Sequence, residues 1–208
     1  MFDPEDNLFL LAGPVKLHPR VQRAMAQPAV AHRGPEFTET NREFFEALQA
    51  VYQTDDPVVC LTGSGTAAMD AAIGSLVGPE EKVVALDNGK FGNRMGLISQ
   101  RYADEVTVVS SDWGQPVDLD EVDRALEGAS ALVLTHNETS SGFTHPLREL
   151  TELAHANDAL IIADCITSLG GIDVPVGELG VDAVLSGSQK CLGAPAGLSF
   201  VSLSERAQ

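Results

Sequence analysis

Short apolar segments alternate with amphipathic ones from Pro57 onward, and this alternation limits the chain to few folds. The apolar segments have the length and composition of buried strands. We expect strands at residues 58–61, 82–86, 105–110, 131–135, 160–164, 183–188 and 199–202. We expect helices at residues 19–26, 38–52, 67–77, 93–101, 119–126 and 146–156. Strands that alternate with helices form a mostly parallel sheet with helices on both faces. The sequence therefore predicts an α/β fold around a seven-stranded, mostly parallel sheet.

The length and termini of the chain set its expected class. A chain of 208 residues fits one large domain, which we place at residues 58–208, after an N-terminal segment at residues 1–57. No run of 18 apolar residues occurs, so we expect no membrane-spanning helix. The acidic start, Met-Phe-Asp-Pro-Glu-Asp, lacks the basic region of a signal peptide. Three widely spaced cysteines show no metal-ligand spacing, which predicts buried free thiols in a reducing cytoplasm and no metal site.

The charge of the chain excludes two classes of partner. The net charge is −17 and the pI is about 4.4. Nucleic acids and anionic membranes both require a basic surface, so neither is expected as a partner. Only 4 lysines accompany 30 acidic residues, and the acidic residues are spread along the chain. This composition favours a halophilic protein, whose surface carboxylates stay hydrated in a high-salt cytoplasm.

Two of the expected strands lead to residues of opposite charge. The strand at residues 160–164 ends in Asp164, and the strand at residues 183–188 is followed by Gln189 and Lys190. If these strands are parallel neighbours, both charges lie at one edge of the sheet. Pyridoxal phosphate needs an amine for its Schiff base and a carboxylate beside its pyridinium nitrogen. Each residue alone has an ordinary explanation, as a helix cap or a solvated side chain, so the pair gains weight only with further motifs.

A glycine-rich turn follows the first expected strand and begins the next helix. The turn consists of Gly63, Ser64, Gly65 and Thr66. Backbone N–H groups at a helix N-terminus bind phosphate, and the two hydroxyls can add donors. Together with Ala68 the turn also matches the loose dinucleotide pattern G-x-G-x-x-A, and Asp87 follows where a ribose-binding acid would lie. A nicotinamide-dependent dehydrogenase is therefore an alternative interpretation.

Two further strand–helix junctions carry aromatic or polar residues. Phe91 follows the strand at residues 82–86, where its ring can stack on a flat cofactor or pack under the next helix. Residues 136–142, His-Asn-Glu-Thr-Ser-Ser-Gly, follow the strand at residues 131–135. We expect them to form a loop that lines a site, although a plain turn is an equal alternative.

In this order the motifs resemble those of the class V aminotransferases, a family of fold-type I pyridoxal-phosphate enzymes. The similar branch contains the alanine–glyoxylate, serine–pyruvate and archaeal aspartate aminotransferases. The resemblance runs from Gly13-Pro14 to Ser-Gly-Ser-Gln-Lys at residues 186–190. It implies that residues 58–208 are the large domain that binds pyridoxal 5'-phosphate, and that a C-terminal small domain is missing from a truncated chain. It also implies a homodimer whose substrates are small amino acids and 2-oxo acids.

The resemblance further implies roles for nine residues. Lys190 would be the Schiff-base lysine and Asp164 the partner of the pyridinium nitrogen, and both would be catalytic. Phe91 would stack on one face of the cofactor ring and Ile166 on the other. The remaining cofactor-binding residues would be Ser64, Gly65, Thr66 and Gln189 at the phosphate, and Thr139. Phe91 stands where many relatives have Trp or Tyr, which is a mild departure from the family pattern.

Three alternatives remain open from the sequence. A cysteine desulfurase-like lyase would have a histidine before the lysine, where this chain has Gln189. A dehydrogenase would use the glycine-rich turn and Asp87, and a non-catalytic remnant would keep only the fold. The relatives hold the substrate carboxylate with an arginine that lies beyond this chain. We therefore expect little or no transaminase activity from these 208 residues alone.

The acidic composition predicts that salt stabilises the fold. Carboxylates that outnumber the 13 basic side chains repel one another most strongly at low ionic strength, where screening is weak. We expect the melting temperature, followed by circular dichroism, to rise as KCl is added. A melting temperature that does not rise with KCl would contradict the expected high-salt habitat.

Overall fold

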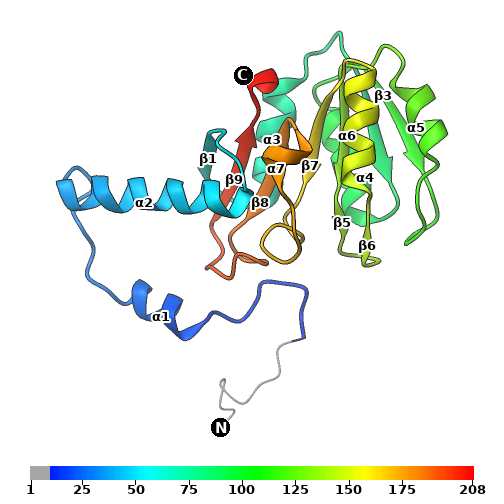
Figure 1. Cartoon of the computed structure of the whole chain (residues 1–208). Helices are drawn as coiled ribbons and strands as arrows, with labels where there is room; N and C mark the ends of the chain where they lie inside the picture. Colours follow the sequence, from blue (N-terminus) through cyan, green and yellow to red (C-terminus); the bar gives the residue numbers. More distant parts are fainter. Residues whose placement is uncertain (1–9) are drawn as a thin grey trace.

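The computed structural model describes residues 10–208 and is built around one seven-stranded sheet (Figure 1). The strand order is β1-β9-β8-β7-β4-β2-β3, and only the pairs that β9 makes with β1 and β8 are antiparallel. The strands of the sheet are β1 (Val58–Thr62), β2 (Lys82–Asp87), β3 (Glu105–Ser110), β4 (Ala131–Thr135), β7 (Leu160–Asp164), β8 (Ala183–Gly187) and β9 (Leu198–Leu203). The predicted mostly parallel sheet is thus confirmed.

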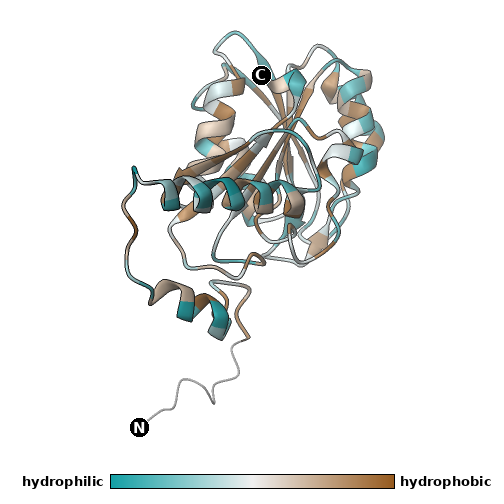
Figure 2. Cartoon of the chain, turned by 60° about the vertical axis from the view of Figure 1, so that its left-hand side comes forward, coloured by the Kyte–Doolittle hydropathy of each residue, from teal (hydrophilic) through white to brown (hydrophobic). Residues whose placement is uncertain are grey.

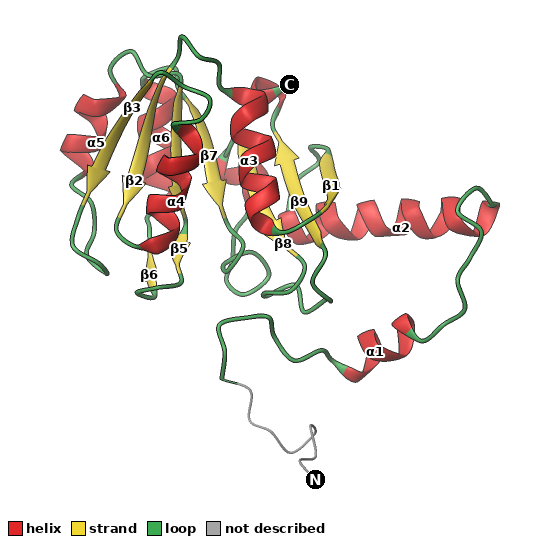
Figure 3. Cartoon of the chain, turned by 180° about the vertical axis from the view of Figure 1, so that it is seen from behind, coloured by secondary structure: helices red, strands yellow, loops and turns green. Residues whose placement is uncertain are grey.

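Helices cover both faces of the sheet (Figure 3). The helices of the described residues are α1 (Pro19–Met25), α2 (Pro35–Tyr52), α3 (Gly65–Leu76), α4 (Lys90–Ser99), α5 (Leu119–Leu126), α6 (Leu147–Ala156), α7 (Val176–Leu179) and the short 3₁₀ helix η1 (Glu205–Ala207). The helices α3 and α4 bury their apolar residues in one hydrophobic cluster with one face of the sheet. The helices α2, α5, α6 and α7 share the second cluster on the other face.

The strands are apolar throughout because both of their faces are covered. In β7, Ile161 belongs to the cluster under α5 and α6, and Ile162 belongs to the cluster under α3 and α4. Both side chains are 0% exposed. Leu132 and Val133 in β4 divide between the two clusters in the same way. The apolar strands therefore lie at the centre of the molecule, between the more polar helices (Figure 2).

Within the described part of the N-terminal segment, residues 10–57, α2 is the helix that packs into the hydrophobic core. This helix packs Leu48 and Tyr52 into the second cluster, whereas α1 has no buried residue and stands apart from the sheet (Figures 1 and 3). No helix among residues 10–208 is long and apolar enough to cross a membrane.

Several local predictions were inaccurate. The helix α3 begins at Gly65, within the glycine-rich turn, instead of residue 67, and α4 begins at Lys90, directly after Gly89, instead of residue 93. Residues 136–142 contain β5 (Asn137–Glu138), which pairs with β6 (Phe143–Thr144) in a two-stranded sheet that the sequence did not indicate. The three cysteines are free, as expected, but only Cys165 is buried.

Replacement of a core leucine is expected to destabilise the fold strongly. Leu132→Ala removes a side chain that is 0% exposed and leaves a cavity in the central strand β4. We expect a loss of about 2–5 kcal/mol in the free energy of unfolding, measured by urea titration. Leu97→Ala, at a leucine of α4 that is 57% exposed, is the matched control and should change this value by less than about 0.5 kcal/mol. Equal effects of the two changes would contradict the assigned core.

Candidate active site

A cavity at the carboxyl ends of the parallel strands contains every residue that the sequence predicted for the site. It is lined by Ser64, Gly65, Thr66, Met69, Phe91, Arg94, Thr139, Asp164, Ile166, Thr167, Gln189 and Lys190. These residues come from the loops and helices that follow β1, β2, β4, β7 and β8. Ligands of open α/β sheets bind at this edge, so the cavity is the candidate active site.

Asp164 is the buried charge of the cavity. It ends β7, where it pairs with Thr135 of β4 and Leu185 of β8, and it is only 3% exposed. Its carboxylate accepts hydrogen bonds from the Ile166 N–H at 2.9 Å and from the Thr135 hydroxyl at 3.3 Å. Burial raises the pKa of Asp164 to about 6, although these hydrogen bonds oppose the rise. A cation bound in the cavity would therefore stabilise the ionised form of Asp164.

Lys190 lies at the next strand end, in the turn after β8. Its Nζ atom is 3.4 Å from the backbone oxygen of Ala12, and the Val15 N–H donates to the oxygen of Gln189 at 2.9 Å. A Cβ atom at Gly13 would overlap the Lys190 side chain. The N-terminal loop at residues 12–15 therefore packs directly on the lysine, and Gly13 allows this close approach.

The glycine-rich turn forms the N-terminus of α3. Ser64 caps the helix by accepting a hydrogen bond from the Ala67 N–H at 3.3 Å. Gly65 is buried against Ile166, whose side chain would overlap a Cβ atom at this position. The positive end of a 12-residue helix thus borders the cavity beside the Thr66 hydroxyl. This arrangement suits the binding of a phosphate.

Phe91 and Arg94 form the wall contributed by α4. The guanidinium carbon of Arg94 lies 4.9 Å from the centroid of the half-buried Phe91 ring. Arg94 Nη1 also donates to the Thr66 hydroxyl oxygen at 3.1 Å, which joins α4 to α3. Arg94 was not predicted as a site residue, although its place three residues after Phe91 puts both on one helix face.

The loop after β4 contributes one predicted residue to the cavity. Thr139 donates its hydroxyl hydrogen to Thr167 Oγ1 at 3.2 Å, and Thr167 in turn donates to the backbone oxygen of Asn137 at 2.9 Å. Thr167 was missed in the sequence because no motif marked it. His136 at the start of the loop is buried and contacts Ser168 Oγ at 3.0 Å. Burial lowers the pKa of His136 to about 4, so this histidine is neutral at physiological pH.

Asp87 is not placed as a dinucleotide-binding fold would require. It ends β2, whereas the glycine-rich turn follows β1, and β9, β8, β7 and β4 lie between these two strands. Its carboxylate accepts from the Gly89 N–H at 3.3 Å and from Asn93 Nδ2 at 2.9 Å, within its own turn. The dehydrogenase interpretation depended on Asp87 lying beside the turn, and this strand order contradicts it.

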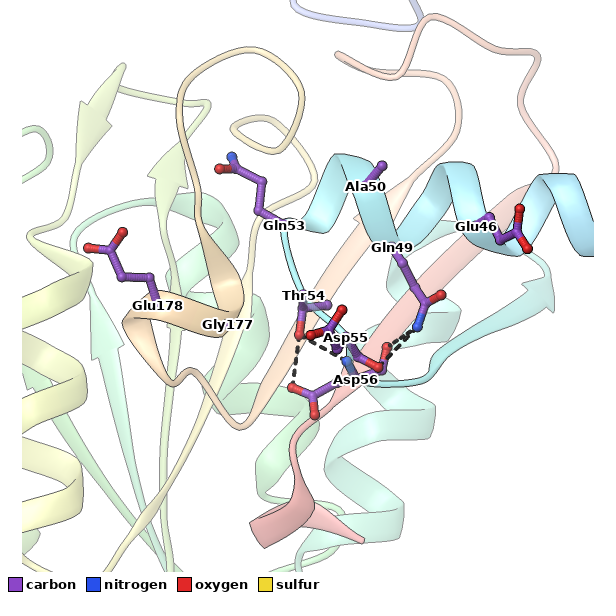
Figure 4. A pocket seen from close by; sticks show the side chains of 9 residues that line it. All are labelled: Glu46, Gln49, Ala50, Gln53, Thr54, Asp55, Asp56, Gly177 and Glu178. Carbon is purple, nitrogen blue, oxygen red and sulfur yellow. Dashed lines mark hydrogen bonds between the residues drawn. The ribbon is translucent and has the colours of Figure 1, made fainter.

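A larger hollow lies elsewhere, between the C-terminal end of α2 and the helix α7 (Figure 4). Carboxylates from Glu46, Asp55, Asp56 and Glu178 line it, and Lys190 does not. It offers no cation to an anionic ligand, so the candidate site remains the cavity beside Lys190.

Comparison with known proteins identifies the family of the chain. The sequence model of the family described as "Aminotransferase class-V" matches residues 18–208. The chain belongs to the class V aminotransferases. It is 36% identical over 208 residues to an uncharacterized aminotransferase of Methanocaldococcus jannaschii, a match that covers 99% of this chain and 54% of the relative.

Two solved aminotransferase structures are similar to nearly the whole chain. The alanine–glyoxylate aminotransferase of Nostoc sp. has a TM-score of 0.89 and 36% sequence identity. The match covers 100% of this chain and 58% of the Nostoc chain. The aspartate aminotransferase of Thermus thermophilus has a TM-score of 0.89 and 37% sequence identity. The match covers 94% of this chain and 56% of the Thermus chain. The chain thus spans about half the length of the relatives it matches. These relatives favour neither the desulfurase nor the dehydrogenase alternative.

Replacement of the buried carboxylate is expected to stabilise the cofactor-free chain at neutral pH. Because the pKa of Asp164 is raised from 3.8 to about 6, the folded state binds this proton more tightly than the unfolded state. Stability therefore falls as the pH rises between these two values and stays low above them. Asp164→Asn keeps an acceptor for the Ile166 N–H without the charge. We expect its free energy of unfolding at neutral pH to exceed that of the wild type by about 2–3 kcal/mol.

Urea titrations at two pH values test this expectation. The wild type and Asp164→Asn share every other titrating group, so their difference isolates Asp164. At a pH well below 3.8 both the folded and the unfolded wild type hold the proton, and the difference should vanish. If Asp164→Asn is less stable than the wild type at neutral pH, the ionised Asp164 does not destabilise the folded state and the expectation is contradicted.

Proposed function

We propose that the chain is the cofactor-binding part of a pyridoxal 5'-phosphate-dependent aminotransferase. The reaction would move an amino group from a small L-amino acid, such as alanine, serine or aspartate, to a 2-oxo acid such as glyoxylate, pyruvate or 2-oxoglutarate. The observation that carries the proposal is that Lys190 and Asp164 line one cavity with the N-terminus of α3. The names of the similar alanine–glyoxylate and aspartate aminotransferases support the substrate class.

The residues of the cavity fit this cofactor. Lys190 offers a primary amine, and Asp164 offers a buried carboxylate that suits a protonated pyridine nitrogen. The helix N-terminus with Ser64, Gly65 and Thr66, assisted by Gln189, would hold the phosphate. The cofactor ring would lie between Phe91 and Ile166. Thr139 would contact the cofactor from the loop after β4.

When bound, pyridoxal phosphate supplies an aldehyde that links reversibly to amines and a pyridinium ring that accepts the electrons released at the α-carbon of an amino acid. Lys190 Nζ would hold the aldehyde until the substrate amine replaces it. The freed Lys190 amine would then move the α-proton as general base and acid. Asp164 would keep the pyridine nitrogen protonated, because the paired cation favours the ionised carboxylate.

We extend the proposal to assembly and location. Leu10, Leu11 and Met25 of the N-terminal segment are 82%, 61% and 60% exposed, and burial of such side chains against a second copy would favour a homodimer. Three free thiols agree with a reducing cytoplasm. We also propose that residues 1–57 serve dimer and small-domain contacts, whereas residues 58–208 bind the cofactor.

Removal of the lysine amine is expected to abolish covalent attachment of the cofactor. The wild-type chain mixed with pyridoxal phosphate should show a visible absorption band that borohydride removes, and mass spectrometry should then find the label on Lys190. Lys190→Ala should show neither the band nor the label, because no other lysine lines the cavity. Lys82→Ala, at the opposite end of β2, is the control and should behave as the wild type. A band that survives in Lys190→Ala would contradict the proposed function.

A further inference from the structure

Glu138 is a fully buried carboxylate that the proposed reaction does not use. Its side chain is 0% exposed and does not line the cavity. Its Oε2 atom accepts from the N–H groups of Phe91 and Gly92, both at 2.9 Å. Its Oε1 atom accepts from the N–H and the hydroxyl of Ser140, at 3.0 and 2.6 Å. Four donors thus compensate for the burial of this charge.

These hydrogen bonds cap the N-terminus of α4 from a distant part of the chain. The residue at the N-cap, Gly89, has no side chain to cap the helix, and a Cβ atom there would lie 2.5 Å from Glu138 Cγ. Ser140 Oγ accepts from the N–H of Lys90 at 3.0 Å. The first three N–H groups of α4 are therefore all bound by Glu138 and Ser140. An anion is favoured at this end of a helix.

The turn of helix that Glu138 holds carries one wall of the cavity. Phe91 lies in this turn and Arg94 follows it directly, where Arg94 contacts the Phe91 ring and the Thr66 hydroxyl. A shift of this turn would move the aromatic wall and the link to α3 together. Glu138 thus contacts the backbone that places Phe91, without contacting the cavity itself.

We propose that Glu138 is a positioning residue, whose carboxylate fixes the first turn of α4 and thereby holds the Phe91 ring against a bound cofactor. The inference rests on the proposed function, because it concerns the affinity for pyridoxal phosphate. Glu138 acts through Phe91, so its effect depends on that ring.

Glu138→Gln in the full 208-residue chain tests the proposal. Glutamine has the same size, but its NH₂ group is a hydrogen-bond donor. This group would replace one of the two oxygens of Glu138, each of which accepts hydrogen bonds, and would therefore face another donor. We expect the Kd for pyridoxal phosphate, from absorbance titration, to rise about tenfold or more. The visible circular dichroism of the bound cofactor should also weaken, while borohydride still labels Lys190. Glu152→Gln removes the same charge from an exposed site on α6 and should leave the Kd unchanged.

A double-mutant cycle with Phe91→Ala separates positioning from a general loss of structure. If Glu138 acts through Phe91, the two changes are non-additive, and Glu138→Gln weakens binding far less when Phe91 is already alanine. Fully additive effects, or an unchanged Kd in Glu138→Gln, would overturn the proposal.

Ser140→Ala decides the question if Glu138→Gln does not fold. This change keeps the carboxylate and removes only the hydroxyl that joins Glu138 to the Lys90 N–H. A smaller rise in Kd that is again non-additive with Phe91→Ala supports the proposal, and no rise overturns it. A wild-type chain that forms no reducible adduct would overturn the proposed function and this inference with it. A wild-type adduct with unaffected variants would overturn the positioning role alone.

Discussion

The parallel pairing of β7 with β4 and β8 is the constraint on which the site depends. Its register sets Asp164 level with Thr135 on one side and Leu185 on the other. Because all three strands run the same way, the loops that carry Thr139, Thr167 and Lys190 leave the sheet at one edge. The antiparallel strand β9 separates β1 from β8, yet the turn after β1 still reaches the cavity because Gly65 packs on Ile166. Because neighbouring strands of the sheet are not consecutive in sequence, loops that are far apart along the chain meet at one cavity.

The buried carboxylates of Glu138 and Asp164 accept different numbers of hydrogen bonds, and this difference suits them to different roles. Glu138 accepts four hydrogen bonds, three of them from backbone N–H groups, and two of these belong to the positive end of α4. Asp164 accepts two hydrogen bonds, and burial raises its pKa. The nearby charge of Glu138 adds to this rise. Asp164 therefore has capacity for a cationic partner, which is what a protonated pyridine nitrogen offers, whereas Glu138 is already satisfied by the protein.

The sequence predicted the sheet and most of the cavity, and it failed where tertiary contacts decide. Strands buried on both faces are apolar throughout, so segments such as β4 and β7 could be located from the sequence. The start of α4 was misplaced because its cap comes from Glu138, 46 or more residues away. The dinucleotide-binding interpretation of Asp87 was wrong because the sequence shows the spacing of Asp87 from the glycine-rich turn but does not show the strand order. Thr167 reaches the cavity through hydrogen bonds that no local pattern indicates.

The N-terminal loop shows that the site is not a property of the sheet alone. Gly13 has a φ of +136°, a conformation that favours glycine, and a side chain there would overlap Lys190. The Lys190 amine is therefore held by a segment 178 residues earlier, which packs on it through the oxygen of Ala12. The same loop is joined to the turn after β8 by the hydrogen bond from the Val15 N–H to the Gln189 oxygen. In the proposed reaction the Lys190 amine would attach to the cofactor and then transfer a proton, and it would need a defined starting position that this loop could provide.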